Sequence, residues 1–121
     1  MNKKTVIIGA SDNPERYAYK AAISLLNHQH EILLLGKRSG NINGIEILKD
    51  RSLEINNTNT VTLYINPSHQ KEWYNYIINL KPKRVIFNPG AENEEFEKLL
   101  TENNIEAVEA CTLVMLSVGN F

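Results

Sequence analysis

The residues best placed to do chemistry lie in the stretch from Val6 to Tyr17. An apolar, β-branched run ends at Gly9, a small polar turn follows, and a helical pattern begins after it. The first N–H groups of a helix have no partners within the helix, and the helix dipole favours negative charge there. A glycine turn also lets an anion approach the main chain closely. The turn that begins with Gly9, Ala10 and Ser11 is therefore predicted to hold a phosphate, which points to a nucleotide-type ligand.

Other reactive residue types lack the neighbours that their chemistry needs. Cys111 has no base beside it in the sequence, and a lone cysteine is more often a small buried residue. The three histidines do not have the spacing of metal ligands. The acidic residues around Glu94 and Glu95 suit the first turn of a helix, where their charge matches the dipole. We predict no catalytic residue and no metal site.

Length and composition limit the class of protein. The chain has 121 residues, of which 42% are hydrophobic and 22% are charged, and its net charge is −1. These values fit a single soluble domain over residues 1–121, and they give no basic field that would attract nucleic acid. One cysteine excludes an internal disulfide, which suits a reducing, cytoplasmic location. No apolar run resembles a signal peptide or reaches the roughly 18 residues of a membrane span.

Apolar, β-branched runs alternate with helical patterns along the chain. The predicted strands are Thr5–Ile8, Glu31–Leu35, Val61–Ile65, Arg84–Phe87 and Ile105–Val108. Helical patterns follow the first, third and fourth of these strands, and a short final helix is predicted near Cys111–Leu116. Because such alternation requires crossover connections, we expect a Rossmann-like α/β fold with a doubly wound, parallel, five-stranded sheet in three layers, α/β/α.

The ends of two predicted helices carry specific expectations. The first helix begins either with Asn13 as its cap or nearer Tyr17, in which case Asn13–Arg16 forms a separate turn. The turn Asn66–Ser68 contains a capping residue, and a helix is predicted to continue from it to about Leu80. These boundaries decide where free N–H groups lie.

Two further segments complete the pattern. Asn93 is predicted to cap a helix whose first turn holds Glu94 and Glu95. From Gly36 to Asn59 the sequence indicates a long loop with a short strand at Gly44–Leu48. Long loops in small domains are usually functional or disordered. In a doubly wound sheet ligands bind at the carboxyl ends of strands, so we expect the turns there to converge on one rim.

The segments in this order resemble the small Rossmann-type CoA-binding proteins, whose fold also forms the CoA-binding domain of the succinyl-CoA synthetase alpha subunit. The likeness is carried by Val6–Ser11 with Asn13-Pro14 and Arg16-Tyr17, by Gly36–Gly40 leading to Gly44, by Tyr64–Pro67, by Phe87–Asn93 and by Ala110–Leu116. It spans nearly the whole chain. The longer N-terminal segment of many members is absent, and the loop after Gly36 does not match residue by residue.

The resemblance implies coenzyme A or an acyl-CoA as the ligand. It places the pyrophosphate against Gly9, Ala10 and Ser11, with Asn13 and Arg16 alongside. It places the ribose phosphate near Lys37 and Arg38, the adenine near Asn66 and Pro67, and the pantetheine arm near Asn88, Pro89 and Gly90. Lys37 and Arg38 stand where an acidic residue would bind the ribose of NAD, which favours a phosphorylated ribose and therefore also fits NADP.

The sequence favours a binding module, which holds CoA or an acyl-CoA by recognition alone, over an enzyme. The runner-up is a small NADP-dependent oxidoreductase or another dinucleotide-binding protein. A third alternative is a regulatory or interaction subunit without a ligand. We expect a small-molecule partner and neither nucleic acid nor a membrane, and the sequence leaves open a homodimer or a partner enzyme.

Overall fold

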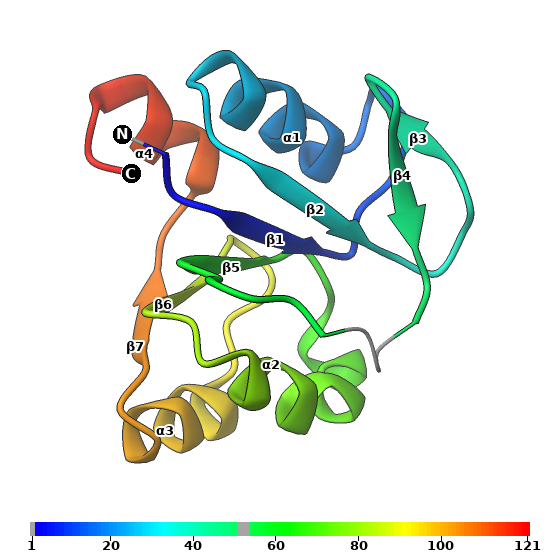
Figure 1. The fold of residues 1–121 in the computed structure, drawn as a ribbon. Coiled ribbons are helices and arrows are strands. Elements are labelled where there is room, and N and C mark those ends of the chain that lie inside the picture. Colours follow the sequence, from blue (N-terminus) through cyan, green and yellow to red (C-terminus); the bar gives the residue numbers. More distant parts are fainter. Residues whose placement is uncertain (1, 51–53) are drawn as a thin grey trace.

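The computed structural model describes residues 2–50 and 54–121, which are organised around one sheet (Figure 1). Its strands are β1 Thr5–Ile8, β2 Ile32–Leu35, β3 Asn41–Ile42, β4 Ile45–Leu48, β5 Thr60–Leu63, β6 Arg84–Phe87 and β7 Glu106–Glu109. Their order in space is β3-β4-β2-β1-β5-β6-β7, and every neighbouring pair is parallel except β3 with β4. Strand order reverses at β1, so the carboxyl ends of the neighbouring strands β2, β1 and β5 lie side by side at the same end of the sheet.

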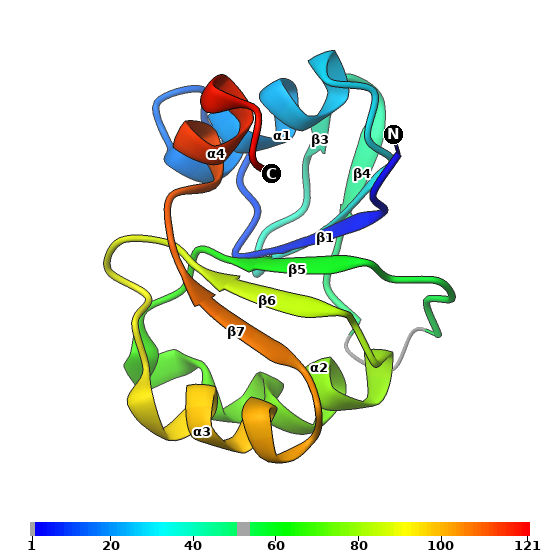
Figure 2. The same cartoon turned by 90° about the vertical axis from the view of Figure 1, so that its left-hand side faces the viewer.

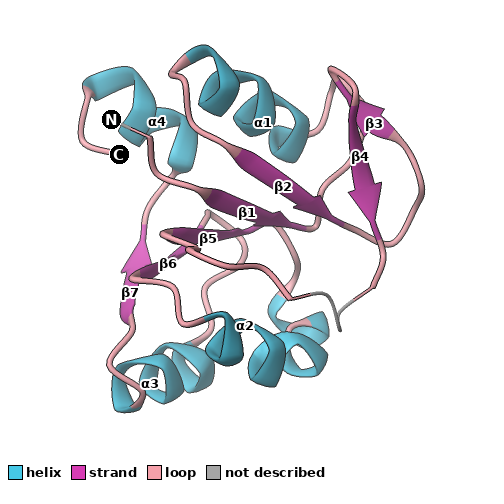
Figure 3. Ribbon diagram, viewed as in Figure 1, coloured by secondary structure: helices cyan, strands magenta, loops and turns pink. Residues whose placement is uncertain are grey.

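Helices cover both faces of the sheet (Figures 1 and 2). α1 Tyr17–Asn27 and α4 Thr112–Val118 lie on one face, and α2 Tyr74–Leu80 and α3 Glu94–Glu102 lie on the other. Each face has its own cluster of buried apolar side chains. Because both faces are covered, β1 and β5 are buried along their whole length, as expected for central parallel strands. The predicted α/β fold is confirmed, and the sheet is parallel except at the pair β3–β4 (Figure 3).

α1 packs closely on the sheet through small side chains. Ala18, Ala21 and Ala22 are buried on its inner face. The helix begins at Tyr17, so of the two predicted starts the later one is confirmed. Asn13 instead organises the preceding turn: its carbonyl oxygen accepts from the N–H of Arg16 at 3.0 Å, and its Oδ1 accepts from the N–H of Glu15 at 3.0 Å.

The prediction of a five-stranded sheet is wrong, because the segment after Gly36 adds a hairpin to one edge. β3 pairs with β4 in antiparallel fashion, and β4 pairs in parallel with β2. Asn43 and Gly44 connect the two strands with φ values of 50° and 85°, the left-handed conformation that tight hairpin turns require. The described sheet therefore has seven strands, and the predicted short strand in this segment is part of it.

The prediction of a single helix after Asn66 is also wrong. Two 3₁₀ turns, Pro67–His69 and Lys71–Trp73, precede α2, which begins only at Tyr74. The Nε2 of the fully buried Gln70 donates to the carbonyl oxygens of Ile65 and Ala91, at 3.0 and 2.7 Å. These bonds tie the segment to its neighbours, and the chain forms i→i+3 bonds around Gln70 rather than a regular helix.

The predicted cap of the next helix is confirmed. Asn93 Oδ1 accepts from the N–H of Phe96 at 3.1 Å, and the first turn of α3 carries Glu94, Glu95 and Glu97. Negative charge at this end matches the helix dipole. α4 follows β7 as the predicted short final helix. It ends at Val118, and the cap residue Gly119 has a φ of 80°, the left-handed conformation that glycine adopts without strain.

His30 joins the chain termini of the described region to the sheet. Its Nδ1 accepts from the N–H of Lys3 at 2.9 Å, and its ring lies against that of Phe121 with centroids 5.0 Å apart. The guanidinium of Arg84 lies 4.4 Å from the same ring of Phe121. Burial lowers the pKa of His30 below its ordinary value of 6.5, and the positive charges of Lys3 and Arg84 lower it further.

The lowered pKa of His30 predicts an acid-sensitive fold. The unfolded histidine binds a proton more readily than the folded one, so the free energy of unfolding should fall as the pH drops below 6.5 and level off below the folded pKa. Urea titrations between about pH 7.5 and about pH 5.5 measure this slope. His30→Gln should flatten it, whereas His69→Gln, at an exposed histidine, should not. An unchanged slope in His30→Gln would contradict the assignment.

Candidate functional site

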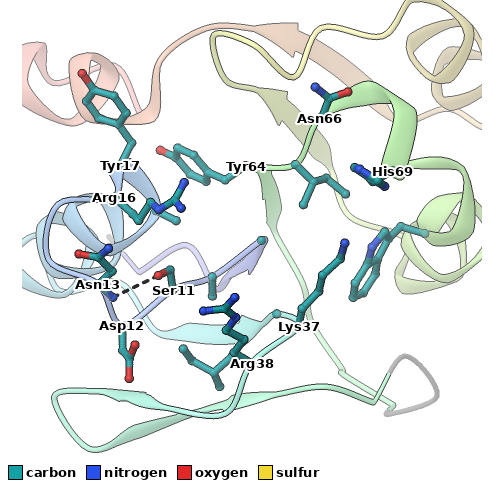
Figure 4. A pocket seen from close by; sticks show the side chains of 17 residues that line it. Ser11, Asp12, Asn13, Arg16, Tyr17, Lys37, Arg38, Tyr64, Asn66 and His69 are labelled. Carbon is teal, nitrogen blue, oxygen red and sulfur yellow. Dashed lines mark hydrogen bonds between the residues drawn. The ribbon is translucent and has the colours of Figure 1, made fainter.

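A cavity of about 640 Å³ opens at the carboxyl ends of β1, β2 and β5. It brings together the predicted site residues Gly9, Ala10, Ser11, Asn13, Arg16, Lys37, Arg38 and Asn66 (Figure 4). The predicted residues Pro67, Asn88, Pro89 and Gly90 do not line it. The loops that follow three adjacent strands thus form one site, at the position where doubly wound sheets bind ligands.

Two glycines allow these loops to cross closely. A Cβ at Gly9, whose φ is +91°, would lie 2.6 Å from the carbonyl oxygen of Tyr64. A Cβ at Gly36 would lie 2.6 Å from the carbonyl oxygen of Ala10. Neither position has room for a side chain, because the nearest atom that a Cβ would meet is a backbone carbonyl oxygen in both cases. The ends of β2, β1 and β5 are therefore held at one level by main-chain packing.

The expected phosphate donors at Gly9 and Ala10 are already used. Both N–H groups donate to the carbonyl oxygen of Leu35, each at 2.9 Å. Ser11 Oγ accepts from the N–H of Asn13 at 3.1 Å, which leaves its own proton available. Within the described residues, the N–H groups of Ser11 and Asp12 donate no hydrogen bond. The N–H groups of this turn that are free to bind an anion thus begin at Ser11 rather than at Gly9 in the described part of the chain.

The start of α1 adds further donors. Arg16 occupies the cap position with extended backbone and forms no side-chain cap. Among the described residues, the N–H groups of Tyr17 and Ala18 have no acceptor, and the helix dipole places partial positive charge there. Tyr17 and Ala18 also line the cavity. The turn and the helix start together therefore present N–H groups suited to an anion.

Cationic side chains surround the same space. Arg16, Lys37 and Arg38 line the cavity, all three are exposed, and none forms an ion pair with a described residue. Figure 4 shows Arg16 on one side and Lys37 and Arg38 on the other, with the carboxylate of Asp12 directed away from the middle. A chain with a net charge of −1 thus has a locally positive cavity, which favours a ligand with several negative charges.

An apolar and aromatic wall was not proposed as part of the site from the sequence. The cavity is also lined by Tyr64, Ile65, His69 and Trp73 from the segment after β5, and by Ile47 from β4. Aromatic residues at the end of an apolar strand were the available signal for Tyr64. The 3₁₀ turns that bring His69 and Trp73 to the cavity have no comparable signal in the sequence.

Asn88 is a buried structural link. Its Nδ2 donates to Thr62 Oγ1 at 2.7 Å and to the carbonyl oxygen of Leu63 at 2.9 Å, and its Oδ1 accepts from the N–H of Thr112 at 2.9 Å. The Oγ1 atoms of Thr62 and Thr112 lie 2.8 Å apart. These bonds fix the start of α4 to β5 and β6. The side chain that the sequence placed beside a ligand arm is thus engaged within the protein.

The described part of the chain has neither a cluster of metal-ligating side chains nor a membrane-spanning helix. No group of at least three His, Cys, Asp or Glu side chains there is arranged to hold a metal ion. Across residues 2–50 and 54–121, no helix combines the length and apolar character needed to span a bilayer. Cys111 is a half-buried free thiol and does not line the cavity.

The sheet and its helices form a Rossmann-like fold, and the cavity lies where such folds bind ligands. The chain belongs to the CoA-binding domain family, whose model, described as "CoA binding domain", matches residues 3–117. The resemblance seen in the sequence is thereby confirmed. Among curated proteins, none matches the chain.

Solved structures agree with this assignment of fold. An uncharacterized protein of known crystal structure is 55% identical, with a TM-score of 0.98, and the match covers 100% of this chain and 99% of that one. A hypothetical protein from Pyrococcus horikoshii OT3 is 24% identical, with a TM-score of 0.87 over 97% of this chain and 83% of that one. A Thermus thermophilus protein is 22% identical, with a TM-score of 0.85 over 99% and 91%. The last two share the fold.

Substitution of Gly9 should destabilise the protein because of its close backbone neighbours. Gly44 is a matched control: its φ is +85°, but a Cβ there would meet nothing within 4 Å. Gly44→Ala should cost about 1 kcal/mol, from the left-handed backbone alone. Gly9→Ala should cost about 3 kcal/mol or more, because the collision with Tyr64 adds to that strain. Urea denaturation measures both, and equal losses would contradict the role of the close crossing.

Proposed function

We propose that residues 1–121 form one domain that binds coenzyme A or an acyl-CoA and performs no catalysis of its own. The family match supports this ligand class. The observation that carries the proposal is a cavity lined by cations that have no ion-pair partner among residues 2–50 and 54–121, beside a turn and a helix start whose N–H groups are free of bonds to those residues. CoA combines a diphosphate with a phosphorylated ribose, so it needs two anion sites, and the cavity has basic side chains on both sides.

Each part of the ligand has a complementary segment in this proposal. The diphosphate would bind the N–H groups of Ser11 and Asp12, the start of α1 and the guanidinium of Arg16. The ribose phosphate would bind Lys37 and Arg38. The adenine would lie against the apolar wall near Ile65 and Trp73, which gives a flat base contact area.

The absence of catalysis is proposed from the chemistry of the lining. Ser11 Oγ accepts the N–H of Asn13 within its own turn. Cys111 lies outside the cavity lining, beside Tyr64, whose raised pKa makes it an unsuitable base at neutral pH. A binding module of this kind could sense CoA, present it to a partner enzyme or protect its thiol.

Ligand-induced stabilisation should identify the ligand. CoA or acetyl-CoA at about 100 times its dissociation constant should raise the free energy of unfolding by about 2.7 kcal/mol. Thermal melts with CoA, acetyl-CoA, NADP and NAD measure this, and Cys111→Ala should leave the CoA shift intact. A shift with NADP and none with CoA would contradict the proposal and favour the oxidoreductase. No shift with any of them would favour a subunit without a ligand.

The basic loop should distinguish CoA from dephospho-CoA, which lacks the ribose phosphate. The double variant Lys37→Gln with Arg38→Gln should weaken CoA binding about tenfold or more, because hydrogen bonds between charged groups are lost. Its affinity for dephospho-CoA should stay close to that of the wild type. Calorimetric titration measures both constants, with Lys98→Gln on the exposed part of α3 as the control. Equal weakening of the two ligands would contradict this assignment of the loop.

A further inference from the structure

Tyr64 lies in the cavity wall, and its hydroxyl group is buried close to the hydroxyls of Thr112 and Thr62. It follows β5 and lines the cavity. Its hydroxyl is buried, and among the described residues it forms no hydrogen bond of ordinary geometry. Burial raises the pKa of Tyr64 to about 12, although the hydroxyls of Thr112 and Thr62 lie near enough to oppose this rise. The side chain therefore stays a neutral donor at physiological pH.

Tyr64 and the residue after it serve different sides of the site. Successive side chains of an extended strand point to opposite faces. Tyr64 packs with the apolar cluster under α1 and α4, whereas Ile65 packs with the cluster under α2 and α3. Trp73 belongs to the same cluster as Ile65. The aromatic wall suited to a base thus lies on one side, and the Tyr64 hydroxyl lies on the other.

The loops at the carboxyl ends of the strands follow one another in the order of the strands, and this order indicates where each part of a ligand would lie. The sheet order β2-β1-β5 places the loop with Lys37 and Arg38 on one side of the turn with Ser11, and Tyr64 on the other side, at strand spacings of about 4.8 Å. Figure 4 shows the Tyr64 hydroxyl directed toward Arg16 and away from Lys37. If the diphosphate of a ligand binds at the central turn and its ribose phosphate binds beyond β2, Tyr64 lies on the opposite side of the turn, where the remaining arm can extend.

We propose that Tyr64 is a specificity-determining residue, whose hydroxyl hydrogen-bonds the polar arm that extends from the diphosphate of CoA. This inference rests on the proposed function and adds a residue that reads the part of the ligand beyond the nucleotide. Buried polar groups are nearly always hydrogen-bonded in folded proteins. Because Tyr64 lines the cavity and its buried hydroxyl has no ordinary hydrogen bond among the described residues, we take the missing partner to be one that the ligand supplies.

The test compares Tyr64→Phe with the wild type, using CoA and adenosine 3′,5′-bisphosphate, which keeps the phosphorylated ribose but lacks the arm. Calorimetric titration should show CoA binding weakened about five- to tenfold, the loss of one hydrogen bond. Binding of the bisphosphate should be unchanged. The control is Tyr19→Phe, a half-buried tyrosine in the same layer that does not line the cavity, and it should leave both affinities unchanged.

A second measurement separates ligand recognition from structure. Without ligand, Tyr64→Phe should melt at the same temperature as the wild type or higher, because it removes an unpaired buried hydroxyl. A lower melting temperature with unchanged CoA affinity would show that the hydroxyl supports the fold, and it would overturn the inference. Equal weakening of CoA and the bisphosphate would overturn it as well. If the wild type binds no CoA, the proposed function fails too, whereas normal CoA binding by both proteins rejects only the role of Tyr64.

Discussion

The fold and its cavity depend on the close packing of three strand ends. The carbonyl oxygen of Leu35 accepts the N–H groups of both Gly9 and Ala10, and main-chain atoms of Tyr64 fill the space where a side chain of Gly9 would lie. The loops after β2, β1 and β5 therefore leave the sheet at one level and from fixed positions. The same bonds use the N–H groups at the beginning of the turn, so an anion meets free donors only from Ser11 onward.

The electrostatic character of the site is local. The chain as a whole carries a net charge of −1, yet Arg16, Lys37 and Arg38 face one cavity without an ion-pair partner among the described residues. Unpaired cations in a partly enclosed space attract a polyanion more strongly than the same charges spread over a surface. The hairpin β3–β4 gives this arrangement its outer wall through Ile47, so the segment that holds no helix contributes both charge and shape.

The sequence allowed much of the fold to be predicted, because the strands near the centre are buried on both faces and therefore consist of apolar, β-branched runs. The edge hairpin was missed although the pair Asn43-Gly44, a strong hairpin signal, lies within it. Its strands are short and partly exposed, so they give no long apolar run. The 3₁₀ turns before α2 depend on the tertiary hydrogen bonds of Gln70, which no local pattern contains.

The part of the candidate site that could be predicted consists of loop residues whose types are typical of anion binding. Glycine turns and basic residues after strands indicated the residues that now face the cavity. Asn88 is of a residue type that often binds ligands, but its side-chain amide forms hydrogen bonds with Thr62, Leu63 and Thr112. Only the three-dimensional arrangement distinguishes an asparagine that faces a ligand from one that links strands and helices. Tyr64 and Trp73 line the cavity but were not predicted as site residues, because aromatic residues in a small domain usually belong to the core.

The central claim is that CoA binds across the loops after β2, β1 and β5, with its diphosphate at the turn and the helix start. The most direct measurement is a CoA titration followed by the backbone amide resonances of the isotope-labelled protein. The account predicts that the largest shifts occur at Ser11 and Asp12 and at the first residues of α1, with further shifts at Lys37, Arg38 and Tyr64. Saturable shifts confined to residues at the amino ends of the strands, such as Asn57 and Lys83 before β5 and β6, would contradict it, as would no shifts at all.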